Sequence, residues 1–182
     1  MMFSKLLMIG AIVCQTASSP TSTEAQIFTE DQIAIHEIAK EVCENYDNVD
    51  PELIIAVVQK ESVYDPEASN GNCVGLMQVS LKYHKDRAEE LGVTDFYDEY
   101  SNILLGTDYI SELLYEYEDI NLVLMLYNMK WDSAFSLYKQ GKVSSYAKDV
   151  LSKAETIAAY TDTQLYGQEV IFNAEKSIVN LQ

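Results

Sequence analysis

A run of six consecutive apolar residues, Leu53 to Val58, places the strongest constraint on how this chain can fold. The run follows Asp50-Pro51, and Asp as N-cap with Pro at the first helical position is a typical helix start. A helix that is apolar at successive positions is buried on most of its faces. The sequence therefore predicts a largely buried helix over about 51–61.

Glu61 ends this predicted helix. Burial disfavours the charged form of a carboxyl group, and so does the partial negative charge at a helix C-terminus. Both effects raise the pKa of the carboxyl, which suits a general acid that works near neutral pH. From the helix alone, an exposed acid at a frayed helix end is the simpler interpretation.

The rest of the chain predicts an all-α protein, because no stretch shows sustained alternation of apolar and polar residues. Thr29-Glu30-Asp31-Gln32 matches a capping box and opens a helix that runs to about Glu44. Ser69-Asn70-Gly71-Asn72 predicts a turn, and Gly92 is expected to stop a short helix. The further helices are expected near 80–91 and over 102–117, 122–127, 131–138, 146–154 and about 155–182.

The N-terminus is typical of an export signal. Lys5 precedes an apolar stretch from Leu6 to Val13 that is too short to span a bilayer, and Thr23-Glu24-Ala25 matches a small-x-small cleavage site. We therefore expect residues 1–25 to be a signal peptide, and the protein to be exported and extracytoplasmic or wall-associated. A lipid anchor through Cys14 is not expected, because Ile12 and Val13 are bulkier than such a motif favours.

The net charge of −17 disfavours nucleic-acid binding, which depends on Lys and Arg neutralising phosphates. His36 and His84 stand alone in the sequence and are expected at the surface, so neither a metal site nor a cofactor is predicted. After removal of the signal, Cys43 and Cys73 remain. In an exported protein they either form a disulfide or stay as free thiols, and the sequence leaves both alternatives open.

Several short motifs occur in the order and at the separations that one family shows. They are Asp50-Pro51-Glu52-Leu53, Glu61-Ser62, Tyr64-Asp65-Pro66-x-Ala68, Gly75-Leu76-Met77-Gln78-Val79, Asn102-Ile103-x-x-Gly106-x-x-Tyr109-Ile110-x-x-Leu113-Leu114, Leu126-Tyr127-Asn128 and Ser145-Tyr146-x-x-x-Val150. Over residues 46–153 the chain resembles the catalytic domain of soluble lytic transglycosylases, in the lysozyme-like superfamily that includes goose-type lysozyme. Residues 26–45 would then be an N-terminal helix of this domain, and 154–182 a helical C-terminal extension.

The resemblance implies a lysozyme-like fold and cleavage of the β-1,4 bond between N-acetylmuramic acid and N-acetylglucosamine in peptidoglycan. Glu61 aligns with the single catalytic acid of the family. It would protonate the glycosidic oxygen and then, as carboxylate, accept the proton of the C6 hydroxyl that closes a 1,6-anhydro ring. This scheme consumes no water and differs from the glycosidase schemes that use two carboxylates.

The resemblance also suggests substrate-binding residues. Gly75 would let the backbone approach a sugar, Gln78 would bind an acetamido or hydroxyl group, and Met77 would pack on a sugar face unless it belongs to the core. Tyr146 would approach the acid, with an ordinary core tyrosine as the alternative. The remaining candidates are Tyr127 and Asn128 near the acid, and Asn70 with Ser69, which stand where the family often has a serine that holds the carboxyl.

The sequence departs from the family at Lys130, where a glycine is usual, and around Cys73, where a bridge to Cys43 would brace the loop. Two rival functions therefore stay open. One is a muramidase that hydrolyses the same bond, and the other is a silent peptidoglycan-binding protein. The expected partners are peptidoglycan glycan strands and an envelope protein that brings the acidic chain to the anionic wall, and the chain is expected to be a monomer.

Overall fold

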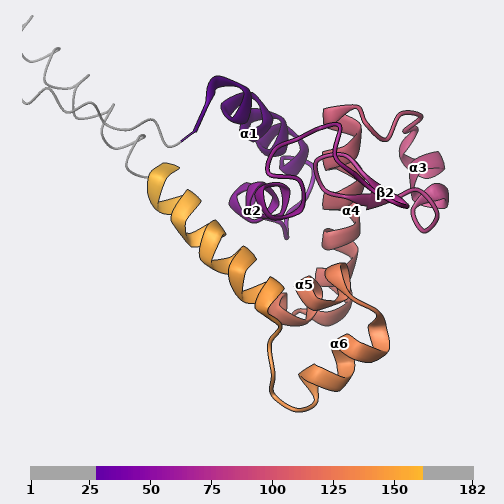
Figure 1. The fold of residues 1–182 in the computed structure, drawn as a ribbon, viewed down its shortest axis with the longest axis vertical. Coiled ribbons are helices and arrows are strands. Elements are labelled where there is room, and N and C mark those ends of the chain that lie inside the picture. The colour runs from indigo at the N-terminus through magenta and orange to yellow at the C-terminus, as the bar shows by residue number, and fades with distance from the viewer. Residues whose placement is uncertain (1–27, 162–182) are drawn as a thin grey trace, which may run out of the picture.

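Helix α4 (Glu99–Tyr117) lies at the centre of the fold in the computed structural model, which describes residues 28–161 (Figure 1). The helices α1 (Glu30–Cys43), α3 (Lys85–Leu91) and α5 (Ile120–Asn128) all pack against it, as does the last strand of a small sheet. The other elements are α2 (Pro51–Glu61), which packs on α1, and α6 (Trp131–Tyr138), which packs on α5. The expected signal peptide, Cys14 and residues 162–182 lie outside the described residues.

A last helix occupies residues 145–161 and continues through the domain boundary expected between 153 and 154. It buries Tyr146, Ala147, Val150 and Ile157. In Figure 1 it extends from the neighbourhood of α5 past α2. The ring of Tyr160 meets the ring of Phe28 at a centroid distance of 5.3 Å, so this helix closes the domain against its first described residues.

The helix boundaries follow local sequence signals closely. Thr29 caps α1 in a capping box with Gln32, as expected. Pro51 begins α2, but the Asp50 side chain at the N-cap forms no capping hydrogen bond. All six apolar residues from Leu53 to Val58 are at most 8% exposed, so the prediction of a buried helix is confirmed.

The mostly helical fold is confirmed, but the sequence missed a three-stranded antiparallel sheet. Its strands are β1 (Ser69–Asn70), β2 (Cys73–Val74) and β3 (Val79–Ser80), in the order β1-β2-β3. Two-residue strands are too short to show the alternation by which strands are recognised. Because Val79 and Ser80 belong to β3, the helix expected near 80–91 begins only at Lys85, and Gly92 ends it in the left-handed conformation.

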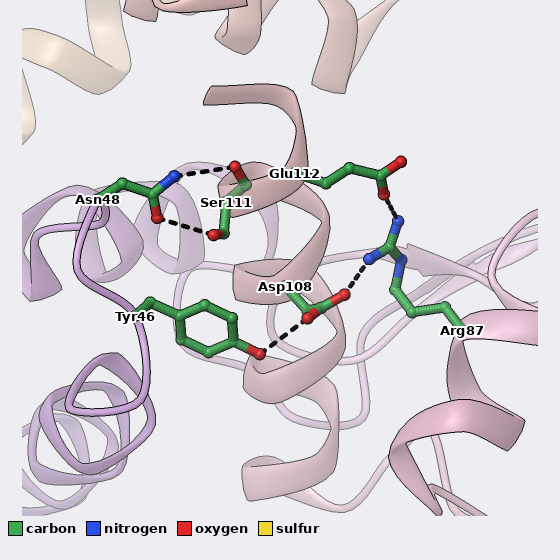
Figure 2. A network of polar contacts seen from close by, with 6 residues as sticks. All are labelled: Tyr46, Asn48, Arg87, Asp108, Ser111 and Glu112. Atoms are coloured by element: carbon green, nitrogen blue, oxygen red, sulfur yellow. Dashed lines mark hydrogen bonds and ion pairs between the residues drawn. The ribbon is translucent and has the colours of Figure 1, made fainter. Parts of the chain in front are cut away.

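A polar network joins the loop after α1 to helices α3 and α4 (Figure 2). The Tyr46 hydroxyl donates to Asp108 at 3.0 Å, and the Arg87 guanidinium forms ion pairs with both Asp108 and Glu112. Asn48 and Ser111 exchange two hydrogen bonds of 3.0 and 2.7 Å. These contacts fix the loop that leads into α2, and therefore the position of the helix that ends at Glu61.

The expectation that both histidines lie at the surface is wrong. His36 is only 8% exposed, and its Nε2 atom lies 3.0 Å from the Tyr64 hydroxyl. His84 is half-buried against the ring of Tyr109 at a centroid distance of 4.7 Å. Between residues 28 and 161, no helix is both long and apolar enough to cross a membrane.

Candidate active site

Glu61 lies at the last position of α2 and is half-buried. Its Oε1 atom accepts a hydrogen bond of 2.5 Å from the hydroxyl of Tyr146, which lies near the start of the last helix and is 8% exposed. The candidate acid thus comes together with the tyrosine expected beside it. The geometry excludes the frayed, solvated helix end that the sequence left open.

The pKa of Glu61 is raised above its ordinary value, and burial is the main cause. The hydrogen bond from Tyr146 and the positive charge of Lys60 act in the opposite direction, because both favour the carboxylate. The pKa of Tyr146 is also raised, first by burial and then by the charge of Glu61. Tyr146 therefore remains a protonated donor. In Glu61, burial favours the protonated form, while Tyr146 and Lys60 favour the carboxylate.

A second contact between the same two helices lies beside the acid and was missed in the sequence. Lys60 forms an ion pair of 2.7 Å with Asp149, and Lys153 lies 3.4 Å from the same carboxylate. Asp149 lies one helical turn after Tyr146, so both residues face α2 from the same side of the last helix. The two contacts together fix the end of α2 against this helix.

Tyr127 is a second tyrosine close to the acid. Its hydroxyl donates to the carbonyl oxygen of Met77 at 2.8 Å, and its pKa is raised by burial and by the nearby charge of Glu61. Cys73 is also close, because the charge of Glu61 contributes to raising the pKa of this thiol after the larger effect of burial. The site therefore combines a half-buried carboxyl with two tyrosines, and the sheet forms its edge.

Asn102 holds the loop between strands β2 and β3 in place. Its side chain is fully buried, donates to the carbonyl oxygens of Val74 and Phe96 at 3.0 and 2.7 Å, and accepts from the Met77 N–H at 2.8 Å. The sequence showed it only as part of a motif. The signal that could have revealed it is an amide residue directly before the apolar residues 103–105, on a helix whose apolar spacing predicts a buried face.

Gly75 is needed for this contact, and the approach of its backbone to a sugar, which the resemblance suggested, stays a prediction. It has a φ of +74°, and a Cβ atom there would lie 2.3 Å from the Asn102 Nδ2 atom. Met77 likewise belongs to the core, because its side chain is 0% exposed. It packs against Gly106 so closely that a Cβ atom at Gly106 would lie 2.5 Å from the Met77 sulfur. Its side chain is not available to a ligand in this conformation.

Gln78 is half-buried at a φ of +50° and uses its amide N–H donors on the carbonyl oxygens of Ala68 and Gly75, each at 3.1 Å. Its donors therefore stabilise the loop. Asn128 is exposed at the end of α5 and stays a candidate contact for a ligand. The exposed Ser69 and Asn70 on β1 form no hydrogen bond with Glu61, so neither replaces the expected serine in this structure.

Both cysteines are free thiols, so the disulfide alternative does not apply to this structure. Cys43 is buried at the end of α1, and its pKa is raised to about 12, mainly by burial. Cys73 pairs across the sheet with Ser80 on β3. Backbone pairing and Asn102, not a covalent bond, therefore hold the loop that carries Gly75.

The turn after the acid is conformationally strained. Val63 and Tyr64 have φ values of +55° and +66°, a region that non-glycine residues rarely occupy and that is least favourable for a β-branched residue such as Val63. Such strain occurs where surrounding contacts enforce it. Here the buried Tyr64 hydroxyl is held by His36, and Ser62 donates to the Val58 carbonyl oxygen at 3.1 Å.

No second carboxylate among the described residues contributes to the pKa shift of Glu61. Asp65, the nearest acid that follows it, is exposed and accepts a hydrogen bond from the Glu67 N–H in a turn. Residues 28–161 also contain no cluster of His, Cys, Asp or Glu suited to a metal ion. A cavity of about 1020 Å³ lies elsewhere, between the end of α1, α3 and α4, and none of the residues around Glu61 lines it.

Fold and site together define a lysozyme-like helical domain built around one protonatable acid. The chain belongs to the family described as "Transglycosylase SLT domain", whose model matches residues 40–133.

Two relatives are similar over part of their sequences. The transglycosylase of Enterobacteria phage PRD1 is 39% identical over 82 residues, which is 44% of this chain and 29% of the relative. The membrane-bound lytic murein transglycosylase F of Desulfosudis oleivorans is 40% identical over 72 residues, which is 39% of this chain and 15% of the relative. The matched region thus spans less than a third of either relative.

Solved structures share the fold at low identity. The 70-kDa soluble lytic transglycosylase in complex with bulgecin A superposes with a TM-score of 0.62 at 15% identity, over 72% of this chain and 25% of that one. An inactive mutant of the lytic transglycosylase Slt from Pseudomonas aeruginosa gives a TM-score of 0.58 at 19% identity, over 76% and 24%.

Proposed function

We propose that this protein is a peptidoglycan lytic transglycosylase that cleaves the β-1,4 bond between N-acetylmuramic acid and N-acetylglucosamine without water and leaves 1,6-anhydromuramic ends. The observation that carries the proposal is the half-buried Glu61, whose pKa is raised and whose Oε1 atom is bound by Tyr146. The family membership and the names of the relatives support the substrate class.

In the first step, protonated Glu61 donates its proton to the glycosidic oxygen. The bond from this oxygen to the anomeric carbon of the muramic acid breaks, and positive charge develops on that sugar. Glu61 becomes a carboxylate at the moment when a negative charge beside the sugar is most stabilising. Tyr146 and Lys60 favour this charged form, so they act in the direction that the step requires.

In the second step, the Glu61 carboxylate accepts the proton of the C6 hydroxyl of the same muramic acid. The C6 oxygen forms a bond to the anomeric carbon and closes the 1,6-anhydro ring. The proton is thereby returned to Glu61, and the enzyme is regenerated without another reactant. A single group that alternates between acid and base needs a pKa near the working pH, and burial raises the pKa of Glu61 toward that range.

Among the described residues, no second carboxylate contributes to the pKa shift of Glu61. This favours ring closure over hydrolysis, because a hydrolase of this kind generally positions a nucleophile or a water with a second acid. The decisive experiment is mass analysis of purified sacculi after digestion. A transglycosylase releases anhydro products, which are lighter than the hydrolysed products by one water molecule. Fully hydrated muramic ends would instead identify a muramidase.

The silent peptidoglycan-binding protein is tested by the same assay with Glu61→Gln. If the wild-type protein and the variant both bind sacculi and both leave them intact, the binding function is correct. Loss of product in the variant alone supports catalysis by Glu61.

Export to the cell wall and recruitment by an envelope protein are further parts of the proposal, motivated by the N-terminal sequence and by the net charge of −17, which does not favour attraction to an anionic wall. Recovery of the processed protein outside the cytoplasm would support export. A pull-down from envelope extracts that yields no co-purifying protein would count against the partner.

A further inference from the structure

Trp131 is the only tryptophan in the chain, and it is unusually exposed for a residue of its size, at 47%. It begins α6 directly after the short connection Met129-Lys130 that leaves the exposed Asn128 at the end of α5. Its ring packs edge-on against Tyr117 and is tilted against Phe135, at centroid distances of 5.9 and 6.1 Å. The rings of Tyr117 and Phe135 thus hold the indole in position, while much of its surface is exposed to solvent.

A row of aromatic rings connects Trp131 with the acid. The Trp131 side chain is near enough to Tyr109 to oppose the rise in the pKa of Tyr109 that burial causes, and the Tyr109 ring lies 5.8 Å from the ring of Tyr127. Tyr127 is near enough to Glu61 for the carboxylate charge to raise its pKa further. The row Tyr127, Tyr109 and Trp131 therefore leads from the site of bond cleavage to the protein surface.

The indole contacts the rings of Tyr117 and Phe135 but is not part of the hydrophobic core. The only fully buried residue of this helix is Ala134, and the half-buried Phe135 supplies its larger apolar contact. The exposed part of the indole is a flat apolar surface, and the exposed Asn128 and Lys130 lie beside it in the chain, so apolar and polar groups are available to a ligand at the same place.

We propose that the open face of the Trp131 indole stacks on the apolar face of an N-acetylated sugar in the glycan strand, beyond the sugars that flank the bond at Glu61. The inference rests on the proposed function, since it names a binding position for the same substrate. An aromatic ring offers a flat apolar surface, while the polar edges of the sugar stay hydrated or reach the side chains of Asn128 and Lys130.

The single tryptophan makes a direct test available. In Glu61→Gln protein, which should bind without cleaving, titration with the linear tetramer of N-acetylglucosamine should change the intensity and shift the maximum of the Trp131 emission, with saturation. Calorimetry on the same samples supplies an independent affinity. Calorimetric saturation without any change in emission would overturn the inference.

Kinetics on sacculi give a second readout. Trp131→Ala should raise KM by about fivefold to tenfold, the size expected for one aromatic stacking contact, while kcat stays near the wild-type value. Trp131→Phe should recover most of the loss. Tyr115→Ala is the matched control, because Tyr115 is 66% exposed but lines the separate cavity, and its KM should not change.

An unchanged KM in Trp131→Ala, with wild-type protein that releases anhydro products, overturns the role of Trp131 and leaves the proposed function intact. A wild-type protein that does not cleave sacculi overturns the proposed function, and the fluorescence titration then decides the sugar contact by itself. If calorimetry detects no tetramer binding, the KM comparison is decisive. Thermal unfolding of each variant separates a binding defect from a folding defect.

Discussion

The hydroxyl of Tyr146 donates a hydrogen bond of 2.5 Å to the Oε1 atom of Glu61, across 85 positions of sequence. Burial raises the pKa of the carboxyl, and this hydrogen bond limits the rise because it favours the carboxylate. The two opposing effects suit a group that must first give a proton and then take one back.

Glu61→Gln should reduce anhydro-product release by at least roughly a thousandfold, because both proton transfers of the proposed mechanism depend on this carboxyl. The variant should fold as the wild type does and should be at least as stable above neutral pH. A carboxyl whose pKa is raised in the folded state contributes stability at low pH. This contribution is lost as the pH rises from the pKa of Glu61 in the unfolded chain through its pKa in the folded protein. Thermal unfolding across this pH range should therefore show a smaller loss of stability with rising pH in Glu61→Gln than in the wild type, because Gln carries no charge to bury.

Tyr146→Phe should lower kcat by about 10-fold to 100-fold, because the acid loses the contact that orients it. The hydrogen bond favours the charged carboxylate, so its removal should raise the pKa of Glu61 further and move the basic limb of the kcat/KM profile to higher pH. The matched control is Tyr83→Phe, which changes a 77% exposed tyrosine away from Glu61 and should leave the profile in place. A profile identical to that of the wild type would contradict a role of Tyr146 in tuning the acid.

Gly75→Ala should lower the free energy of unfolding by about 2–4 kcal/mol, because it combines a positive φ with a clash against the buried Asn102 amide. Gly141→Ala is the control, since Gly141 has a similar φ of +66° but no heavy atom within 4 Å of the new Cβ. The control should cost only about 1 kcal/mol. Equal losses in chemical denaturation would mean that the contact with Asn102 adds nothing to the backbone effect.

Stability should fall as the pH drops from about 6.5 toward 4, partly because of His36. Burial is the main reason why the pKa of His36 is lowered to about 4 in the folded protein. His36 therefore binds a proton at higher pH in the unfolded chain than in the folded protein. The loss from this residue is at most about 3 kcal/mol. His36→Gln should flatten the pH dependence in this window, while wild-type stability that stays constant down to pH 4 would exclude a neutral buried histidine.

His84, whose pKa is also lowered to about 4, should make a parallel contribution that His84→Gln measures.

Intact mass should not change on addition of reductant, because Cys43 and Cys73 are free thiols. Alkylation of the folded protein should modify Cys73 before Cys43, since Cys43 is 5% exposed and its pKa is raised to about 12. A mass increase of two hydrogens after reduction would show a bridge between them.

Local patterns were sufficient for most of the helices, whereas the choice of Glu61 as the acid came from the family resemblance and stays a prediction. The capping box at Thr29 and the apolar run before Glu61 are short-range signals, and α1 and α2 form where these signals place them. The strands of the small sheet escaped prediction because two residues give no periodicity, and their pairing depends on the turn at Gly71 and on Asn102.

The sequence by itself determined that this chain buries a helix and ends it with a carboxyl group, since an unbroken apolar run must leave water wherever it packs. Only the tertiary structure decided what surrounds that carboxyl. The hydroxyl of Tyr146, the ion pair of Lys60 with Asp149 and the loop held by Asn102 are contacts between segments far apart in the chain. Tertiary packing also decided that Met77 and His36 are buried. The space beside Gly106 that Met77 fills, and the Tyr64 hydroxyl that contacts His36, are in place only once the helices have packed.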